Sequence, residues 1–277
     1  MSNSFLPFSW AQYDFMKNAL GAVILITPLF ALLGTAVVSK HMAFFSDVLG
    51  HSALTGVALG VLLGMSDPFW AMFVFIIILA VTVNVFKGIT HASADTTLGV
   101  FFAIAVALGV MILSKGGGFN KFTSYLIGDI LAISPKQLML MAVFFLLILI
   151  YWLLFANHLF LISVNPTLAR SRGINILFIE TSFVIVLAIL VAISLRIVGI
   201  LLINSLLVLP AAAARNLAGN TRVYTLWSIL ISMISGICGL IFSYYWGTAS
   251  GATIIIFCAV FYLLAAFLGK FLWYRKV

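Results

Sequence analysis

The sequence predicts an all-α membrane protein, a polytopic transmembrane helical bundle of eight to nine spans, and three observations support this. The 277-residue chain is 65% hydrophobic, only 7% charged, and has a mean hydropathy of +1.29. A soluble domain of this size would need far more charge on its surface. The apolar residues also gather in long runs, and about 20 apolar residues suffice for a helix to cross a bilayer. We therefore expect a single transmembrane domain, residues 1–277, with the lipid bilayer as its surroundings.

Nine apolar runs are candidate spans, and they are separated by linkers rich in Pro, Gly and polar residues. The runs lie at about 19–38, 46–65, 68–86, 96–113, 137–156, 176–195, 197–217, 223–245 and 250–272. With the C-terminus inside, the inner segments carry nine Lys and Arg residues and the outer segments carry five. The positive-inside rule therefore predicts an external N-terminus and a cytoplasmic C-terminus.

Two linkers are longer than the others. Residues 114–136 are expected outside, and their apolar patch from Tyr125 to Ile133 is too short to span, which favours an interfacial or re-entrant helix. Residues 157–175 are expected on the cytoplasmic side. There, Pro166 suits the first turn of a helix and Gly173 suits its end, so a brief helix is expected along the membrane surface. A cytoplasmic partner could press on such a helix.

Asp47 and His51, in the second run, are the candidate metal ligands. Residues four apart lie on one face of a helix, and ionisable residues inside membrane segments indicate a functional site. A carboxylate and an imidazole placed in this way can grip one divalent ion. The alternatives are a structural hydrogen bond between the two side chains, or polar residues at the membrane edge. Two ligands fall short of the four of a structural zinc site, which suits an ion in transit, and water or a symmetry-related subunit could complete the shell.

The same helix carries a second pattern. Thr55 continues the face of Asp47 and His51, whereas Ser52 and three glycines recur every four residues on the adjacent face. Small residues in such a row allow a neighbouring helix to approach closely. We therefore expect Gly56, Gly60 and Gly64 to form a packing seam.

Other polar residues receive structural interpretations. Asp95 precedes the fourth run and is expected to cap its helix, and Asn204 and Ser205 are expected to hydrogen-bond a neighbouring helix. Glu180 is expected at the cytoplasmic interface or facing the bundle. The remaining histidines have no partner at metal-ligand spacing and are left out of the site; they are His41, His91 and His158.

Several function classes are excluded or disfavoured. The sequence contains no Walker-type phosphate loop, dinucleotide-binding glycine pattern or zinc-finger spacing, so any ATP must be bound by a partner chain. The net charge of +8 is spread along the chain, which indicates membrane orientation and no nucleic-acid partner.

Six motifs, taken together and in order, resemble the permease subunits of bacterial zinc/manganese (and iron) ABC importers, which have the type II importer fold. They are Ser46-Asp47…His51-Ser52…Gly56, Asp95-Thr-Thr-Leu-Gly99, Tyr125-Leu-Ile-Gly-Asp-Ile-Leu131, Ala169-Arg-Ser-Arg-Gly173, Val198-Gly199…Leu206-Leu-Val-Leu-Pro-Ala211 and Ser243…Ser250-Gly251. The resemblance covers nearly the whole chain.

The resemblance implies a multi-pass permease of the bacterial cell (inner) membrane. Two copies would pair around a central pathway and sit on ATP-binding cassette ATPase subunits, and an extracytoplasmic solute-binding protein would deliver the metal. Asp47 and His51 match the metal-coordinating positions proposed for the family. The segment that matches the family's coupling helix contains Asn165, Pro166, Ala169, Arg170, Arg172 and Gly173. Asn165 stands where relatives often carry an acidic residue, so a charge-based contact is not expected there.

Three function classes remain in comparison. The first is the ABC permease, which is not an enzyme itself, holds no permanent cofactor and transports a divalent ion: zinc as first choice, with manganese or iron as the alternative. The second, a stand-alone secondary cation transporter, predicts inverted repeats, and no convincing internal repeat is found. The third, an intramembrane enzyme, would need a fuller catalytic set such as His-Glu-x-x-His, which the sequence lacks.

Overall fold

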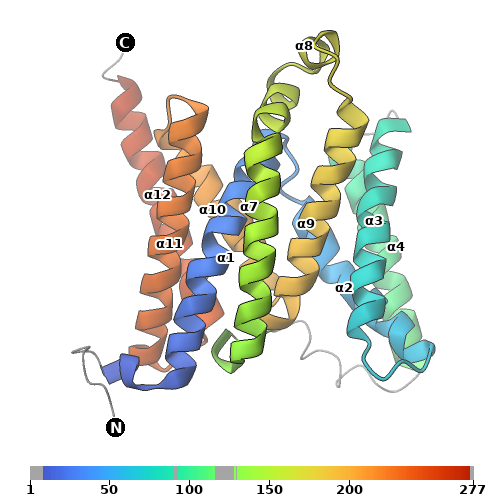
Figure 1. The fold of residues 1–277 in the computed structure, drawn as a ribbon, viewed down its shortest axis with the longest axis vertical. Coiled ribbons are helices and arrows are strands. Elements are labelled where there is room, and N and C mark those ends of the chain that lie inside the picture. Colours follow the sequence, from blue (N-terminus) through green and yellow to red (C-terminus); the bar gives the residue numbers. More distant parts are fainter. Residues whose placement is uncertain (1–8, 90–92, 116–127, 129, 275–277) are drawn as a thin grey trace. The chain divides into compact units, whose positions relative to one another are not determined.

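The computed structural model describes residues 9–89, 93–115, 128 and 130–274. In these residues all of the regular secondary structure is helical, and turns connect the helices (Figure 1). Nine of the described helices are long and apolar enough to cross a membrane, which confirms the nine predicted spans. They are α1 (Asp14–Ser39), α2 (Phe45–Leu62), α3 (Phe69–Ile89), α4 (Ala94–Lys115), α7 (Pro135–Val164), α9 (Ile176–Val198), α10 (Ile200–Leu217), α11 (Thr221–Trp246) and α12 (Ser250–Tyr274). Shorter elements are η1 (Ser9–Gln12), η2 (Ile130–Ala132) and α8 (Pro166–Ser171).

The helix ends follow from local sequence. Asn175 and Asn220 begin α9 and α11, and each side chain accepts a hydrogen bond from the backbone N–H three residues later. The prediction that Asp95 caps α4 is wrong. The hydroxyl of Ser93 accepts the hydrogen bond from the Thr96 N–H instead (3.1 Å), and Asp95 lies exposed in the first turn. A carboxylate in that place still favours the helix, because it faces the positive end of the helix dipole.

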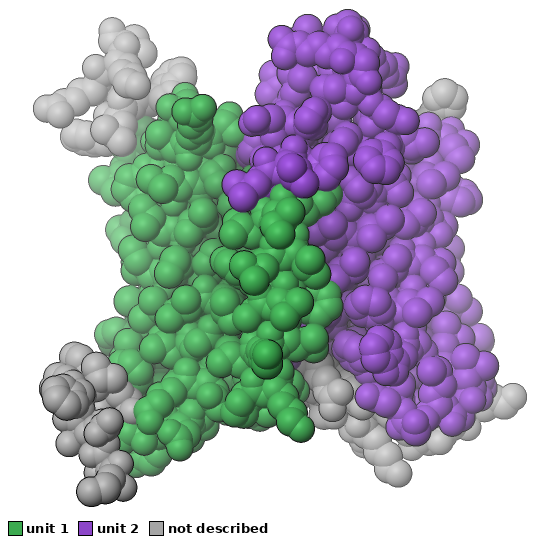
Figure 2. Space-filling model, in the orientation of Figure 1, with its two compact units in different colours: residues 1–35, 129–152, 205–277 green, residues 36–128, 153–204 purple. Residues whose placement is uncertain are grey.

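The chain divides into two compact units (Figure 2). The first unit comprises residues 1–35, 129–152 and 205–277, and the second comprises residues 36–128 and 153–204. The interfacial helix predicted from Tyr125 to Ile133 falls partly outside the described residues. His91 also lies outside them. Of that patch, Ile130 to Ala132 form the short helix η2.

In the first unit, α1 and α12 pack against α11, and the three helices run side by side in Figure 1. Hydroxyl groups along α11 bond to backbone carbonyls of α1: Ser228 donates to Ala31 (3.1 Å) and Ser232 donates to Thr27 (3.0 Å). The close approach of α11 and α12 requires glycine, because a Cβ on Gly239 would lie 2.5 Å from the Cα of Ile254. Close approach at small residues and interhelical hydrogen bonds thus add to van der Waals packing as the means of association in lipid.

In the second unit, α2 is buried along most of its length and packs on α3, α4 and α9. A Cβ on Gly56 would lie 2.5 Å from the Cα of Met72, and one on Gly60 would lie 3.0 Å from the Cα of Pro68. Both glycines therefore allow α3 to approach closely. Gly64 does not contribute to this seam, because α2 ends at Leu62 and Gly64 lies in the following turn, with φ +67° and open space around it.

Thr55 also has a different place from the one expected. It is buried against α4, where its hydroxyl donates to the carbonyl of Ala105. A Cβ on Gly109 would lie only 2.5 Å from the Thr55 Oγ1. Packing of α4 thus covers Thr55, and the polar face of α2 ends at His51.

Candidate metal site

Asp47 and His51 occupy the first two turns of α2 and lie close together on one face of it. The Nε2 of His51 lies 3.5 Å from the Oδ1 of Asp47. The side chains are 24% exposed for Asp47 and 43% exposed for His51, although the neighbouring residues of α2 are buried. The helix therefore presents one accessible carboxylate and one accessible imidazole, close together.

The separation of the two atoms suits a shared metal ion. Two ligands that each bind a tetrahedral zinc ion at about 2.0–2.2 Å lie about 3.4 Å from each other. The observed 3.5 Å is close to that value, so the pair could receive an ion with little rearrangement.

Asn204, in the second turn of α10, holds the carboxylate of Asp47. Its Nδ2 donates to the Asp47 Oδ1 at 3.4 Å, and its Oδ1 accepts a hydrogen bond from the Ser46 hydroxyl at 2.7 Å. Because the Ser46 hydroxyl engages the amide oxygen, the amide NH₂ faces Asp47. This confirms that Asn204 bonds a neighbouring helix. Its role at the candidate site was not foreseen, nor was that of Ser46.

An aromatic side chain from α4 lies beside the imidazole. The rings of His51 and Phe102 meet edge to face, with centroids 5.8 Å apart, and Phe44 lies against the same Phe102 at 5.9 Å. Phe102 follows the start of α4 by eight residues, which corresponds to about 12 Å along the helix. It therefore lies inside a candidate membrane span.

The pair supplies two ligands only. In the part of the chain that the structure describes, no group of three or more His, Cys, Asp or Glu side chains could hold a metal ion. His41 and His158 belong to that part and join no such group. Any further ligand must come from water, another chain or residues outside the described ranges.

The linker expected at residues 157–175 is shorter than predicted, because α7 continues to Val164, but its predicted short helix is present as α8. Asn165 caps it by accepting a hydrogen bond from the Leu168 N–H (3.0 Å), Pro166 stands at its first position, and Gly173 ends it with φ +76°. Ala169 is buried, whereas Arg170 and Arg172 are exposed. The segment therefore exposes two cationic side chains next to a buried alanine.

Comparisons with known proteins agree with the motifs. A model described as the ABC 3 transport family matches residues 12–269. Over 257 residues, the chain is 36% identical to the high-affinity zinc uptake system membrane protein ZnuB of Haemophilus influenzae, covering 92% of this chain and 98% of that protein. It is 28% identical over 272 residues to the manganese transport system membrane protein MntC of Halalkalibacterium halodurans, covering 96% and 92% of the two chains.

The fold agrees as well. The solved structure of PsaBC from Streptococcus pneumoniae in complex with Fab is similar, with a TM-score of 0.79, 25% sequence identity and 92% of each chain covered. The similarity runs through nearly the whole chain in sequence and in structure, and it confirms the resemblance drawn from the six motifs. The chain therefore belongs to the ABC 3 transport family, as a membrane-spanning permease subunit that leaves ATP hydrolysis to a separate subunit.

Proposed function

We propose that this chain forms the pathway by which a divalent transition-metal ion, with zinc as first choice, crosses the bacterial inner membrane. The observation that carries the proposal is the 3.5 Å approach of the His51 Nε2 and the Asp47 Oδ1 on an accessible face of a helix that is buried along most of its length. Imidazole suits zinc, and a mixed set of imidazole and carboxylate also accepts manganese or iron. The names of the relatives, which refer to zinc and to manganese systems, support the first two of these ions.

Asp47 and His51 act as transit ligands in this proposal. Two protein ligands hold an ion more weakly than the four of a structural zinc site, so the ion can leave again. Asn204 keeps the Asp47 carboxylate oriented toward His51, and Phe102 restricts the imidazole from the side of α4. The ion itself is cargo, and no permanently bound cofactor is involved.

In this proposal the chain works as one part of a larger assembly, and its exposed side chains leave places for the other parts. The exposed face of His51 leaves room for ligands from a second copy of the chain, which would place the pathway between two permeases. An ATPase subunit would dock on α8 through Arg170 and Arg172, and an extracytoplasmic solute-binding protein would deliver the ion. Residues 1–277 act as one permease domain in this assembly.

Metal uptake by the reconstituted complex tests the proposal. The permease and its ATPase are placed in proteoliposomes with the solute-binding protein, and uptake of zinc, manganese and iron is compared. Asp47→Ala and His51→Ala are expected to abolish uptake, because each removes half of the ligand set. Asp95→Ala, which removes an exposed carboxylate of α4, is the matched control and should transport normally. Normal uptake by both ligand variants would refute the metal-site assignment, and the preferred ion identifies the cargo.

A further inference from the structure

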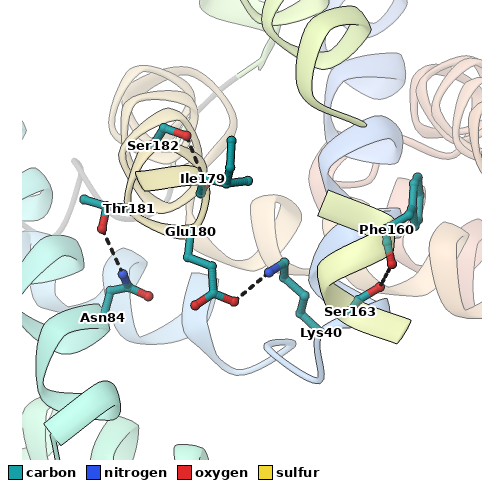
Figure 3. Close-up of polar contacts among 8 residues, drawn as sticks. All are labelled: Lys40, Asn84, Phe160, Ser163, Ile179, Glu180, Thr181 and Ser182. Carbon is teal, nitrogen blue, oxygen red and sulfur yellow. Dashed lines mark hydrogen bonds and ion pairs between the residues drawn. The ribbon is translucent and has the colours of Figure 1, made fainter. Parts of the chain in front are cut away.

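A second charged pair of the same unit lies apart from the metal ligands. Lys40 follows α1 in the connection to α2, and Glu180 lies in the second turn of α9. Figure 3 shows the two side chains extended toward each other, with the Lys40 Nζ 2.8 Å from the Glu180 Oε1. The side chain of Lys40 is only 5% exposed, and that of Glu180 is 34% exposed.

This pair is poorly explained by stability alone. Burial removes the Lys40 ammonium from water and lowers the pKa of that group, and the carboxylate of Glu180 only partly opposes this. Buried ion pairs often contribute no more stability than apolar residues of similar volume. The other two close pairs of an acidic and a basic side chain in the described residues join positions three and four residues apart, whereas Lys40 and Glu180 are 140 residues apart. The pair therefore connects two distant segments.

Glu180 is tied to the segment around α8. Gly173 ends α8, and Asn175 caps α9 two residues later, so α9 begins almost directly after α8. One residue beyond Glu180, Thr181 receives a hydrogen bond from Asn84 of α3 (3.3 Å), as Figure 3 also shows. The N–H groups of Gly173 and Ile174 bond back to the α8 carbonyls of Arg170 and Ala169, so a displacement of α8 is expected to carry the start of α9, and Glu180 with it.

Lys40 is tied to the metal ligands. The connection between α1 and α2 is a hydrogen-bonded turn in which the Met42 N–H donates to Val37 (2.9 Å) and the Phe45 N–H donates to Met42 (2.9 Å). His41, which the first of these hydrogen bonds encloses, adopts φ +54°, a conformation that few residues other than glycine adopt. Asp47 lies in the first turn of the helix that follows. A displacement of Lys40 therefore moves the start of α2 as a unit.

We propose that Lys40 and Glu180 are positioning residues that transmit movement of α8 and the first turns of α9 to α2, and so shift the Asp47–His51 pair when the ATPase acts. The inference rests on the proposed function, since it assigns the route by which ATP hydrolysis reaches that same site. The ion pair suits this role, because a charge-assisted hydrogen bond is roughly twice as strong as a neutral one and so resists separation.

The ratio of ions transported to ATP hydrolysed tests the inference in the reconstituted complex. Glu180→Gln and Lys40→Gln are expected to keep ATP hydrolysis and to lower that ratio about five-fold or more, the range of coupling between distant sites. The charge reversal, Lys40→Glu with Glu180→Lys, should recover most of the loss. Asn84→Ala, which removes the neighbouring bond to Thr181 but no charge, is the matched control and should keep the wild-type ratio.

A variant that keeps the fold separates transmission from stability. Lys40→Met with Glu180→Met replaces the pair by apolar contact and should unfold at or above the wild-type temperature, yet remain uncoupled. A wild-type ratio in that double variant, or in both single variants, would overturn the inference. Failure of the reversal to recover the ratio, with wild-type thermal unfolding, would overturn it too. Zinc binding by the permease without ATP depends on Asp47 and His51 and not on coupling to the ATPase. Failure of the proposed function would therefore appear as absent zinc binding, whereas failure of this inference would appear in the transport ratio alone.

Discussion

Removal of the Asn204 side chain is expected to weaken metal binding without removing a metal ligand. Asn204→Ala deletes the amide that donates to the Asp47 Oδ1 at 3.4 Å and leaves that oxygen free to turn away from His51. Loss of such an orienting partner costs about 10–100-fold in metal affinity. Because 3.4 Å is at the long end of hydrogen-bond distances, we expect the lower value, about ten-fold, or about 1.4 kcal/mol.

Zinc titration of the purified permease against a chromophoric chelator measures this effect. Asn84→Ala is the matched control, since Asn84 also bonds across helices in the same unit but contacts Thr181 and not Asp47. Thermal unfolding in detergent shows whether both variants fold alike. Wild-type zinc affinity in Asn204→Ala, or an equal loss in Asn84→Ala, would refute the orienting role of Asn204.

Three further predictions concern packing, the end of α8 and pH. Gly56→Ala places a methyl group 2.5 Å from the Met72 Cα and is expected to lower the free energy of unfolding by about 1–3 kcal/mol, seen as a lower unfolding temperature. Gly88→Ala is its control, because the added methyl group meets nothing within 4 Å and should not destabilise the protein. Gly173→Ala imposes about 1–2 kcal/mol of backbone strain at φ +76°. This variant is expected to reduce metal-stimulated ATP hydrolysis by the complex while zinc binding persists, and Gly219→Ala, where the added methyl group meets nothing within 4 Å, is its control. Zinc affinity should fall as pH is lowered, because protons compete for the Asp47 carboxylate and the His51 imidazole, and a pH-independent affinity would contradict the ligand assignment.

Local features of the fold could be predicted from the sequence, because each depends on residues close together in the chain. Apolar runs of sufficient length predicted the nine spans, since backbone groups in lipid must be satisfied within the helix itself. Pro166 and Gly173 predicted the bounds of α8 for the same local reason, as their backbone preferences do not depend on the rest of the fold. The four-residue spacing of Asp47 and His51 likewise predicted their shared helical face, because helix geometry alone decides it.

Errors arose where two signals compete locally or where a neighbouring helix decides. Ser93 and Asp95 are both good capping residues, and the start of α4 at Ala94 gives the cap to Ser93. Thr55 continues the face of His51 by spacing, but the approach of α4 at Gly109 buries it. Gly64 has the spacing of a seam residue, yet α2 ends before it.

The sequence by itself determined the membrane-spanning helical class, the α8 segment and the pair of candidate metal ligands. Only the tertiary structure decided what surrounds that pair. Asn204 reaches Asp47 across 157 residues of sequence, and Lys40 meets Glu180 across 140. The periodicity of the sequence does not predict such contacts. They arise when small residues let two helices approach closely and polar side chains on those helices come to lie opposite one another. Composition and spacing thus identified the candidate ligands, and helix packing supplied the side chains that orient them and the ion pair proposed to move them.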